Sequence, residues 1–91
     1  MKPIASFLDK LLKDLGIEVK VKETQALIYW PEVVGERISQ VTEAKEVKGG
    51  KLFIKVKGDS WRNELVYYKG DIISRINDKI GKGVIEDIIF F

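Results

Sequence analysis

A stretch of strictly alternating residues near the middle of the chain constrains the fold more than any other feature. Three aliphatic side chains alternate there with three lysines and a phenylalanine. The aliphatic positions are Leu52, Ile54 and Val56, and the intervening ones are Lys51, Phe53, Lys55 and Lys57. Successive side chains of a strand point to opposite faces of a sheet. The stretch therefore predicts a strand with a buried aliphatic face and a basic, aromatic outer face.

Two further strands are expected beside this one. Residues 43–47 predict a strand that joins residues 51–57 through the turn Lys48-Gly49-Gly50-Lys51, because paired glycines supply the positive φ of tight hairpins. Residues 84–91 are β-branched and aromatic and predict a closing strand. Its two faces would be Val84, Ile88 and Phe90 on one side and Ile85, Ile89 and Phe91 on the other.

Helical spacing dominates the rest of the chain. An apolar face between residues 4 and 15 predicts a helix capped by Gly16. Residues 20–40 also keep a helical period, with Pro31 marking a kink or a break between two helices. Residues 17–21 taken alone alternate as a short strand would.

A last helix is expected to begin at Trp61 behind Ser60 as N-cap and to end at Gly81. Its inward arc would hold Trp61, Leu65, Val66, Tyr68, Ile72, Ile73, Ile76 and Ile80. Trp30 and Trp61 are both interpreted as core anchors, and Tyr67 as solvated. The chain is thus predicted to be one α+β domain over residues 1–91, a single layer of helices on a three-stranded sheet in the order α-α-β-β-α-β.

Composition limits the functions that such a domain can have. The 91 residues contain no cysteine and no histidine, which excludes disulfides, thiol chemistry, Ser-His or Cys-His nucleophiles and an ordinary zinc site. Phosphate-binding glycine motifs are missing, and the carboxylates show no convergence, so neither an NTPase nor another enzyme is expected. No metal or cofactor is expected either.

The same composition bears on location and source. No apolar run approaches the roughly 20 residues of a membrane span, and the N-terminus lacks a signal-peptide core, so we expect a cytoplasmic protein without a membrane partner. Many Ile, Lys and Glu residues with a single Met and no Cys are typical of a thermophilic source. The net charge is only +2, so a charged partner must be recognised by a local patch.

The outer face of the central strand is the candidate patch. Lysines can bind phosphates and a flat ring can stack on a base, which is what a platform for single-stranded nucleic acid needs. The alternative is an ordinary solvated strand face. The candidate nucleic-acid-binding residues are Lys48, Lys51, Phe53, Lys55, Lys57 and Arg62. If DNA does not bind there, the cluster of Lys10, Lys13 and Lys20 is the next candidate.

The closing strand suggests a second surface. Ile89 and Phe91 are large apolar side chains at an exposed strand end, where such groups usually find cover from a helix, a second copy or a partner protein. We therefore expect a partner contact at Ile89 and Phe91, or a homodimer there.

A set of short motifs in a fixed order connects the chain to a known family. They are Trp30-x-x-Val33-Val34-Gly35-x-x-Ile38, Thr42, Gly50-Lys51-Leu52-x-Ile54-x-Val56, Ser60-Trp61-x-x-Glu64-Leu65, Lys69, Ile76-Asn77-x-x-Ile80-Gly81 and Ile88-x-Phe90. Their order and spacing over nearly all of the chain resemble the DciA family of bacterial replicative-helicase loaders. The resemblance implies a cytoplasmic, KH-like domain without catalysis of its own.

The resemblance also implies partners. The domain would help a DnaB-type hexameric helicase onto single-stranded DNA and would itself bind DNA, which we expect to be weak. Two other functions stay open from the residues: a module that binds single-stranded RNA or DNA without a helicase, and a purely structural dimerisation domain.

Overall fold

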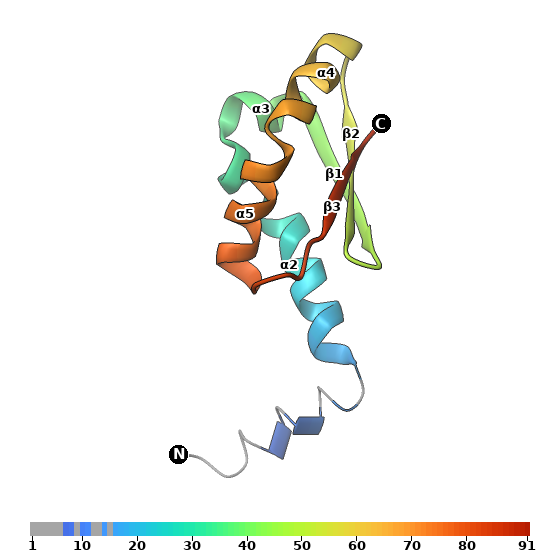
Figure 1. Ribbon diagram of the computed structural model, residues 1–91, viewed down its shortest axis with the longest axis vertical. Coiled ribbons are helices and arrows are strands. Elements are labelled where there is room, and N and C mark those ends of the chain that lie inside the picture. Colours follow the sequence, from blue (N-terminus) through green and yellow to red (C-terminus); the bar gives the residue numbers. More distant parts are fainter. Residues whose placement is uncertain (1–6, 9, 12–13, 15) are drawn as a thin grey trace.

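The chain folds into a three-stranded sheet with the described helices packed on one of its faces (Figure 1). The computed structural model describes residues 7–8, 10–11, 14 and 16–91. The elements are α2 (Ile17–Val34), α3 (Glu36–Gln40), β1 (Thr42–Lys48), β2 (Lys51–Val56), α4 (Asp59–Tyr67), α5 (Lys69–Ile80) and β3 (Asp87–Phe90). This confirms the α+β class, the single layer of helices and the predicted order of elements. The KH-like description stays a prediction.

The sheet is mixed and has β2 at its centre. β1 pairs with β2 antiparallel through the predicted glycine turn, and β3 pairs with β2 in parallel. A β-bulge between Ala44 and Glu46 interrupts the register of β1. Gly50 has φ of 78°, a backbone conformation that favours glycine, and a Cβ there would lie 3.2 Å from Cγ of Glu86.

The core lies between the sheet and the helices. Its most completely buried large side chains are Trp30, Leu52, Ile54, Leu65, Ile76, Ile85 and Ile88. The indole Nε1 of Trp30 donates to Thr42 Oγ1 at 2.9 Å, and that hydroxyl donates to the carbonyl of Ile38 at 2.7 Å. The predicted anchor role of Trp30 is therefore confirmed, and its N–H has the partner that a buried indole needs.

The helical region before the sheet breaks at a different residue from the one predicted. α2 continues through Pro31 to Val34, and the separation from α3 falls at Gly35, with φ of 88° and ψ of 164°. Proline removes one backbone donor, but Trp30 and Val33 on either side of it are buried and hold this turn against the core. Residues 17–21 belong to α2, so the strand alternative is wrong.

The predicted last helix is two helices. α4 begins at Asp59 behind Gly58, so neither the start at Trp61 nor the Ser60 cap is correct. Tyr68, with φ of −99° and ψ of 4°, separates α4 from α5. The break turns part of the expected inward arc outward: Val66 and Tyr68 are about half exposed. α5 ends before Gly81 as predicted, and Tyr67 is solvated as predicted.

The closing strand is shorter than predicted because its first residues follow another course. β3 begins only at Asp87, and Ile85 before it is buried in the core instead of facing outward. The side-chain amide of Asn77 fixes this segment: it accepts from the Ile85 N–H and donates to the Ile85 carbonyl, both at 2.9 Å. The predicted alternation therefore holds only from residue 87 onward.

The predicted first helix lies partly outside the described residues. Residues 1–6, 9, 12–13 and 15 are not described, whereas residues 7–8, 10–11 and 14 are helical. Gly16 has φ of 73° directly before α2.

Candidate nucleic-acid interface

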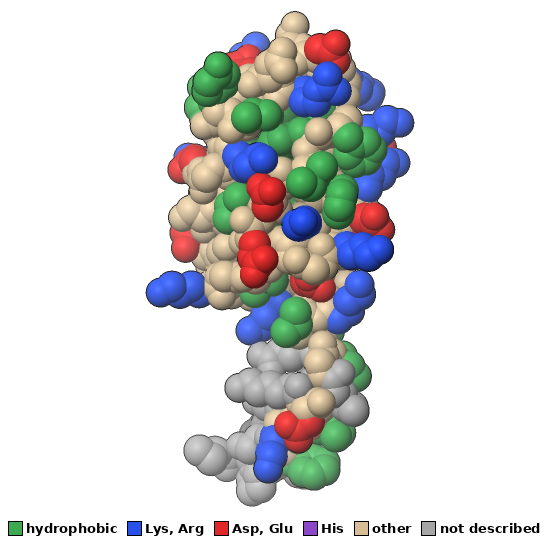
Figure 2. Space-filling view, turned by 45° about the vertical axis from the view of Figure 1, so that its right-hand side comes forward, with side chains coloured by type: hydrophobic (Ala, Val, Ile, Leu, Met, Phe, Trp, Pro, Cys, Tyr) green, Lys and Arg blue, Asp and Glu red, His purple; other side chains and the backbone are tan. Residues whose placement is uncertain are grey.

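The face of the sheet that the helices leave open carries lysines around a phenylalanine. Leu52 and Ile54 of β2 are completely buried, whereas Lys51 and Lys55 are exposed on the other face with Phe53 half-buried between them. Figure 2 brings this side of the molecule forward and shows Lys and Arg side chains around a group of hydrophobic ones. The alternation in the sequence therefore correctly predicted which face of the sheet each side chain of β2 occupies.

Two further lysines lie at the ends of this face. Lys48 is the register partner of Lys51 beside the hairpin turn. Lys57 follows β2, and its N–H donates to the carbonyl of Val41 at 2.8 Å. We call the five residues Lys48, Lys51, Phe53, Lys55 and Lys57 the basic face. In the described part of the chain, none of its four lysines has an ion-pair partner.

Arg62 is placed differently from the lysines of the basic face. It lies in the first turns of α4 and is half-buried, and its Nη2 donates to Asp59 Oδ1 at 2.6 Å. Its guanidinium is therefore already paired with a carboxylate. The structure brings the other five predicted residues together and leaves Arg62 engaged within its own helix.

Two acidic side chains on the same side of the sheet, Glu43 and Asp87, are paired with lysines outside the basic face. Glu43 is 2.9 Å from Lys45, whose ammonium lowers the pKa of the Glu43 carboxyl, and Lys55 and Lys57 add to this effect. The direct ion pair of Glu43 is therefore with Lys45, and Lys55 and Lys57 act on this carboxylate only at longer range.

Asp87 repeats this arrangement at the other edge of the sheet. Its Oδ1 accepts from the backbone N–H of Ile88 at 2.8 Å, which lowers the pKa of the Asp87 carboxyl. The ammonium of Lys69, 3.2 Å from the same carboxylate, lowers it further, and Lys51 adds a smaller contribution.

The predicted partner-binding residues adjoin the basic face. Ile89 is the register partner of Phe53, so both side chains lie on the open side of the sheet. The Phe91 N–H donates to the carbonyl of Ile54, and its carbonyl accepts from Val56, so Phe91 is fixed in the ladder although its side chain is 48% exposed. The sequence indicated two separate surfaces, and the structure joins them into one face with an apolar centre.

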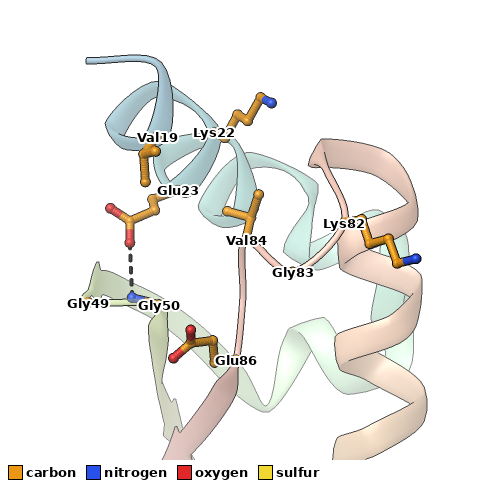
Figure 3. Close-up of a pocket in the computed structure, with 9 residues that line it drawn as sticks. All are labelled: Val19, Lys22, Glu23, Gly49, Gly50, Lys82, Gly83, Val84 and Glu86. Atoms are coloured by element: carbon orange, nitrogen blue, oxygen red, sulfur yellow. Dashed lines mark hydrogen bonds between the residues drawn. The ribbon is translucent and has the colours of Figure 1, made fainter. Parts of the chain in front are cut away.

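A buried carboxylate that the sequence gave no reason to select sets the position of the hairpin. Glu23 of α2 is only 9% exposed, and its Oε2 accepts from the Gly50 N–H at 3.0 Å (Figure 3). The contact closes one side of a pocket of about 460 Å³ that Lys22, Lys82 and Glu86 also line. Since it spans 27 residues of sequence, no local pattern signals it.

Trp61 lines a groove instead of anchoring the core. Its side chain is half-buried and lies outside the core, so the predicted anchor role is wrong. The Arg37 guanidinium carbon lies 5.4 Å from the centroid of the indole, within the range of a cation–π contact. Glu64 and Tyr68 also line this groove of about 400 Å³.

The described residues contain neither a metal-binding cluster of carboxylates nor a membrane-spanning helix. Among them there is no cluster of three or more carboxylates that could hold a metal ion. Among the same residues, no helix combines the length and the apolar character needed to cross a membrane.

Comparison with known proteins places the chain in a family. Residues 3–90 match the family described as Dna[CI] antecedent, DciA. The chain belongs to the DciA family. A UPF0232 protein of Rhodococcus jostii is 26% identical over 87 residues, and one of Corynebacterium glutamicum is 32% identical over 62 residues. The matches cover 96% and 68% of this chain but only 46% and 35% of these relatives. This chain therefore spans less than half of their length.

Proposed function

We propose that this protein is a non-enzymatic replication factor that binds a DnaB-type replicative helicase and helps to load it onto single-stranded DNA. The observation that carries the proposal is the DciA match over residues 3–90, because this family is associated with loading of that helicase. A cytoplasmic location follows from the same role.

The basic face is the proposed contact for single-stranded DNA. Its lysines lack intramolecular ion pairs in the described part of the chain and surround an accessible ring, so phosphates and a base can be bound side by side. The carboxylates of Glu43, Glu46 and Asp87 on the same side oppose part of this attraction. With a net charge of only +2, we expect a dissociation constant in the micromolar range or weaker. The corresponding binding free energy is about −8 kcal/mol or less favourable.

The apolar centre of the open face is the proposed contact for the helicase. Phe91 is the best candidate anchor, because its ring is about half exposed while its backbone is held in the sheet. A rigidly placed aromatic side chain costs little conformational entropy when it binds a partner.

A second function uses the basic face alone. The domain would then bind single-stranded RNA or DNA without any helicase. The arrangement of Phe53 between Lys51 and Lys55 favours this alternative as much as it favours DNA binding during loading.

Co-purification with the replicative helicase from the same source separates the two functions. The tagged chain should retain the hexameric helicase, and Phe91→Ser should weaken retention at least tenfold. Val66→Ser, which removes an equally exposed apolar side chain from α4, is the matched control and should leave retention unchanged. If nucleic acid is retained but helicase is not, the second function replaces the first.

A further inference from the structure

α2 carries apolar side chains on two opposite sides, and only one of them is covered by the domain. Ala26, Trp30 and Val33 on the inner side are buried in the core. On the outer side Ile17, Val21, Thr24 and Ile28 form what we call the outer stripe. At 100° per residue the two sets point about 177° apart.

The outer stripe is open to solvent throughout its length. Ile17 is 42% exposed, Val21 49% and Ile28 70%. Together with Lys20 and Gln25, the stripe lines a shallow groove of about 380 Å³. The hydroxyl of Thr24 donates to the carbonyl of Lys20 at 2.9 Å, so its polar group is satisfied and its methyl group can contribute to an apolar seam.

The spacing of the stripe is that of a coiled-coil seam. Its members are separated by four, three and four residues, which is the a/d alternation of a heptad pattern. A seam of this kind packs against a second helix with the same spacing.

The stripe is also complementary to itself. Because the 4-3-4 spacing is symmetric, a two-fold axis between Val21 and Thr24 would place Ile17 of one copy against Ile28 of the other, and Val21 against Thr24. An interface of this type uses the same surface on both subunits.

The position of the stripe leaves room for such a pairing. Figure 1 shows the N-terminal turns of α2 extending beyond the sheet and the other helices. In the antiparallel arrangement these projecting turns would pack against the part of α2 that lies beside the body of the second copy. A parallel arrangement would instead bring the two bodies together at the same end.

We propose that the outer stripe of α2 binds a second copy of this chain as an antiparallel helix pair. Four side chains per copy bury far less than the roughly 800 Å² per partner of a standard stable interface. The dimer is therefore weak, with a dissociation constant between about 10 µM and 1 mM.

Sedimentation velocity between about 10 µM and 1 mM protein tests the proposal. The mass should rise from 10.4 kDa toward twice that value, and Ile28→Glu should raise the dissociation constant at least tenfold. Val66→Glu places the same charge at an exposed apolar position of α4 and should have no effect. Unchanged thermal unfolding of both variants shows that the fold is intact.

Cysteine cross-linking tests the register, since the native chain contains no cysteine. An equimolar mixture of Val21→Cys and Thr24→Cys proteins should form the mixed disulfide in preference to either homodisulfide. A parallel pair would favour the homodisulfides and contradict the antiparallel pairing. A strict monomer at all concentrations overturns the proposal, and so does a dimer that Phe91→Ser abolishes while Ile28→Glu leaves it unchanged.

Discussion

Reversing two charges on the basic face should halve the salt dependence of DNA binding. Its four lysines are free of intramolecular ion pairs in the described part of the chain, whereas Arg62 is paired with Asp59 and is not counted. A single strand contributes a slope of about −0.7 in log K against log salt for each phosphate contact, so four contacts give about −2.8. The double variant Lys51→Glu with Lys55→Glu leaves two contacts and about −1.4.

Fluorescence anisotropy on a labelled oligonucleotide at several salt concentrations measures this slope. Doubling the salt concentration should weaken binding about sevenfold for the native chain and about 2.6-fold for the variant. The two substitutions also change the net charge from +2 to −2, because each lowers it by 2. The control for net charge is therefore Arg75→Glu with Lys82→Glu, which makes the same change in charge on α5 and just beyond it; because Arg75 is paired with Asp71 at 3.1 Å, the thermal unfolding of this variant is measured as well.

The control separates a local patch from a general charge effect. If both double variants lower the slope equally, net charge rather than the basic face governs binding. If the variant on the basic face keeps the native affinity and slope while its thermal unfolding is unchanged, the DNA site lies elsewhere. The cluster that includes Lys10 and Lys20 would then be the next surface to reverse.

Three further predictions concern the parts of the fold that hold this face in place. Glu23→Ala leaves the Gly50 N–H of the hairpin without its buried acceptor and should lower the free energy of unfolding by about 1–3 kcal/mol. The midpoint of thermal unfolding should fall by about 4–8 °C per kcal/mol. A loss below about 0.5 kcal/mol would show that the contact is unimportant. Trp30→Ala should cost about 3–5 kcal/mol in denaturant titrations and Trp61→Ala clearly less, and equal losses would return Trp61 to the core. Stability and DNA affinity should be flat between about pH 5.5 and 8, because the chain has no histidine. Because folding lowers the pKa of Asp87, its charged carboxylate stabilises the fold above the ordinary carboxyl pKa, and this contribution is lost only as pH falls below about 4. A transition in stability or DNA affinity near pH 6.5 would contradict this prediction.

Periodicity predicted the sheet face reliably because it depends only on local geometry. Side chains in β2 alternate strictly, so the placement of Phe53 between two lysines followed from the order of residues alone. The same argument failed at Ile85, where Asn77 holds the backbone through two hydrogen bonds and the chain is not yet a strand. A side-chain contact of that kind leaves no periodic trace.

The breaks in the helices were decided by packing and could not be located from propensity. Proline is the strongest helix breaker, yet Pro31 lies inside α2 because its neighbours Trp30 and Val33 are anchored in the core. Tyr68 is an ordinary helix residue by type, yet the chain turns there. Tyr68 lines the same groove as Trp61, a residue that was predicted to be core and lies outside it.

The predicted nucleic-acid-binding and partner-binding residues lie on one open face of the sheet. Their two roles can therefore be distinguished only by how each kind of binding responds to conditions and to substitution. Phe53, Ile89 and Phe91 form an apolar group and the lysines of the basic face lie beside it on β1 and β2, an arrangement that suits a protein interface as well as a nucleic-acid platform. The two kinds of binding differ in how they respond to salt. Phosphate contacts weaken steeply as salt rises, because the release of counterions gains less free energy at a higher salt concentration, whereas burial of an aromatic side chain is insensitive to screening. Helicase retention that survives high salt and depends on Phe91, together with DNA binding that is lost at high salt and depends on Lys51 and Lys55, would assign the centre and the rim of one surface to two different partners.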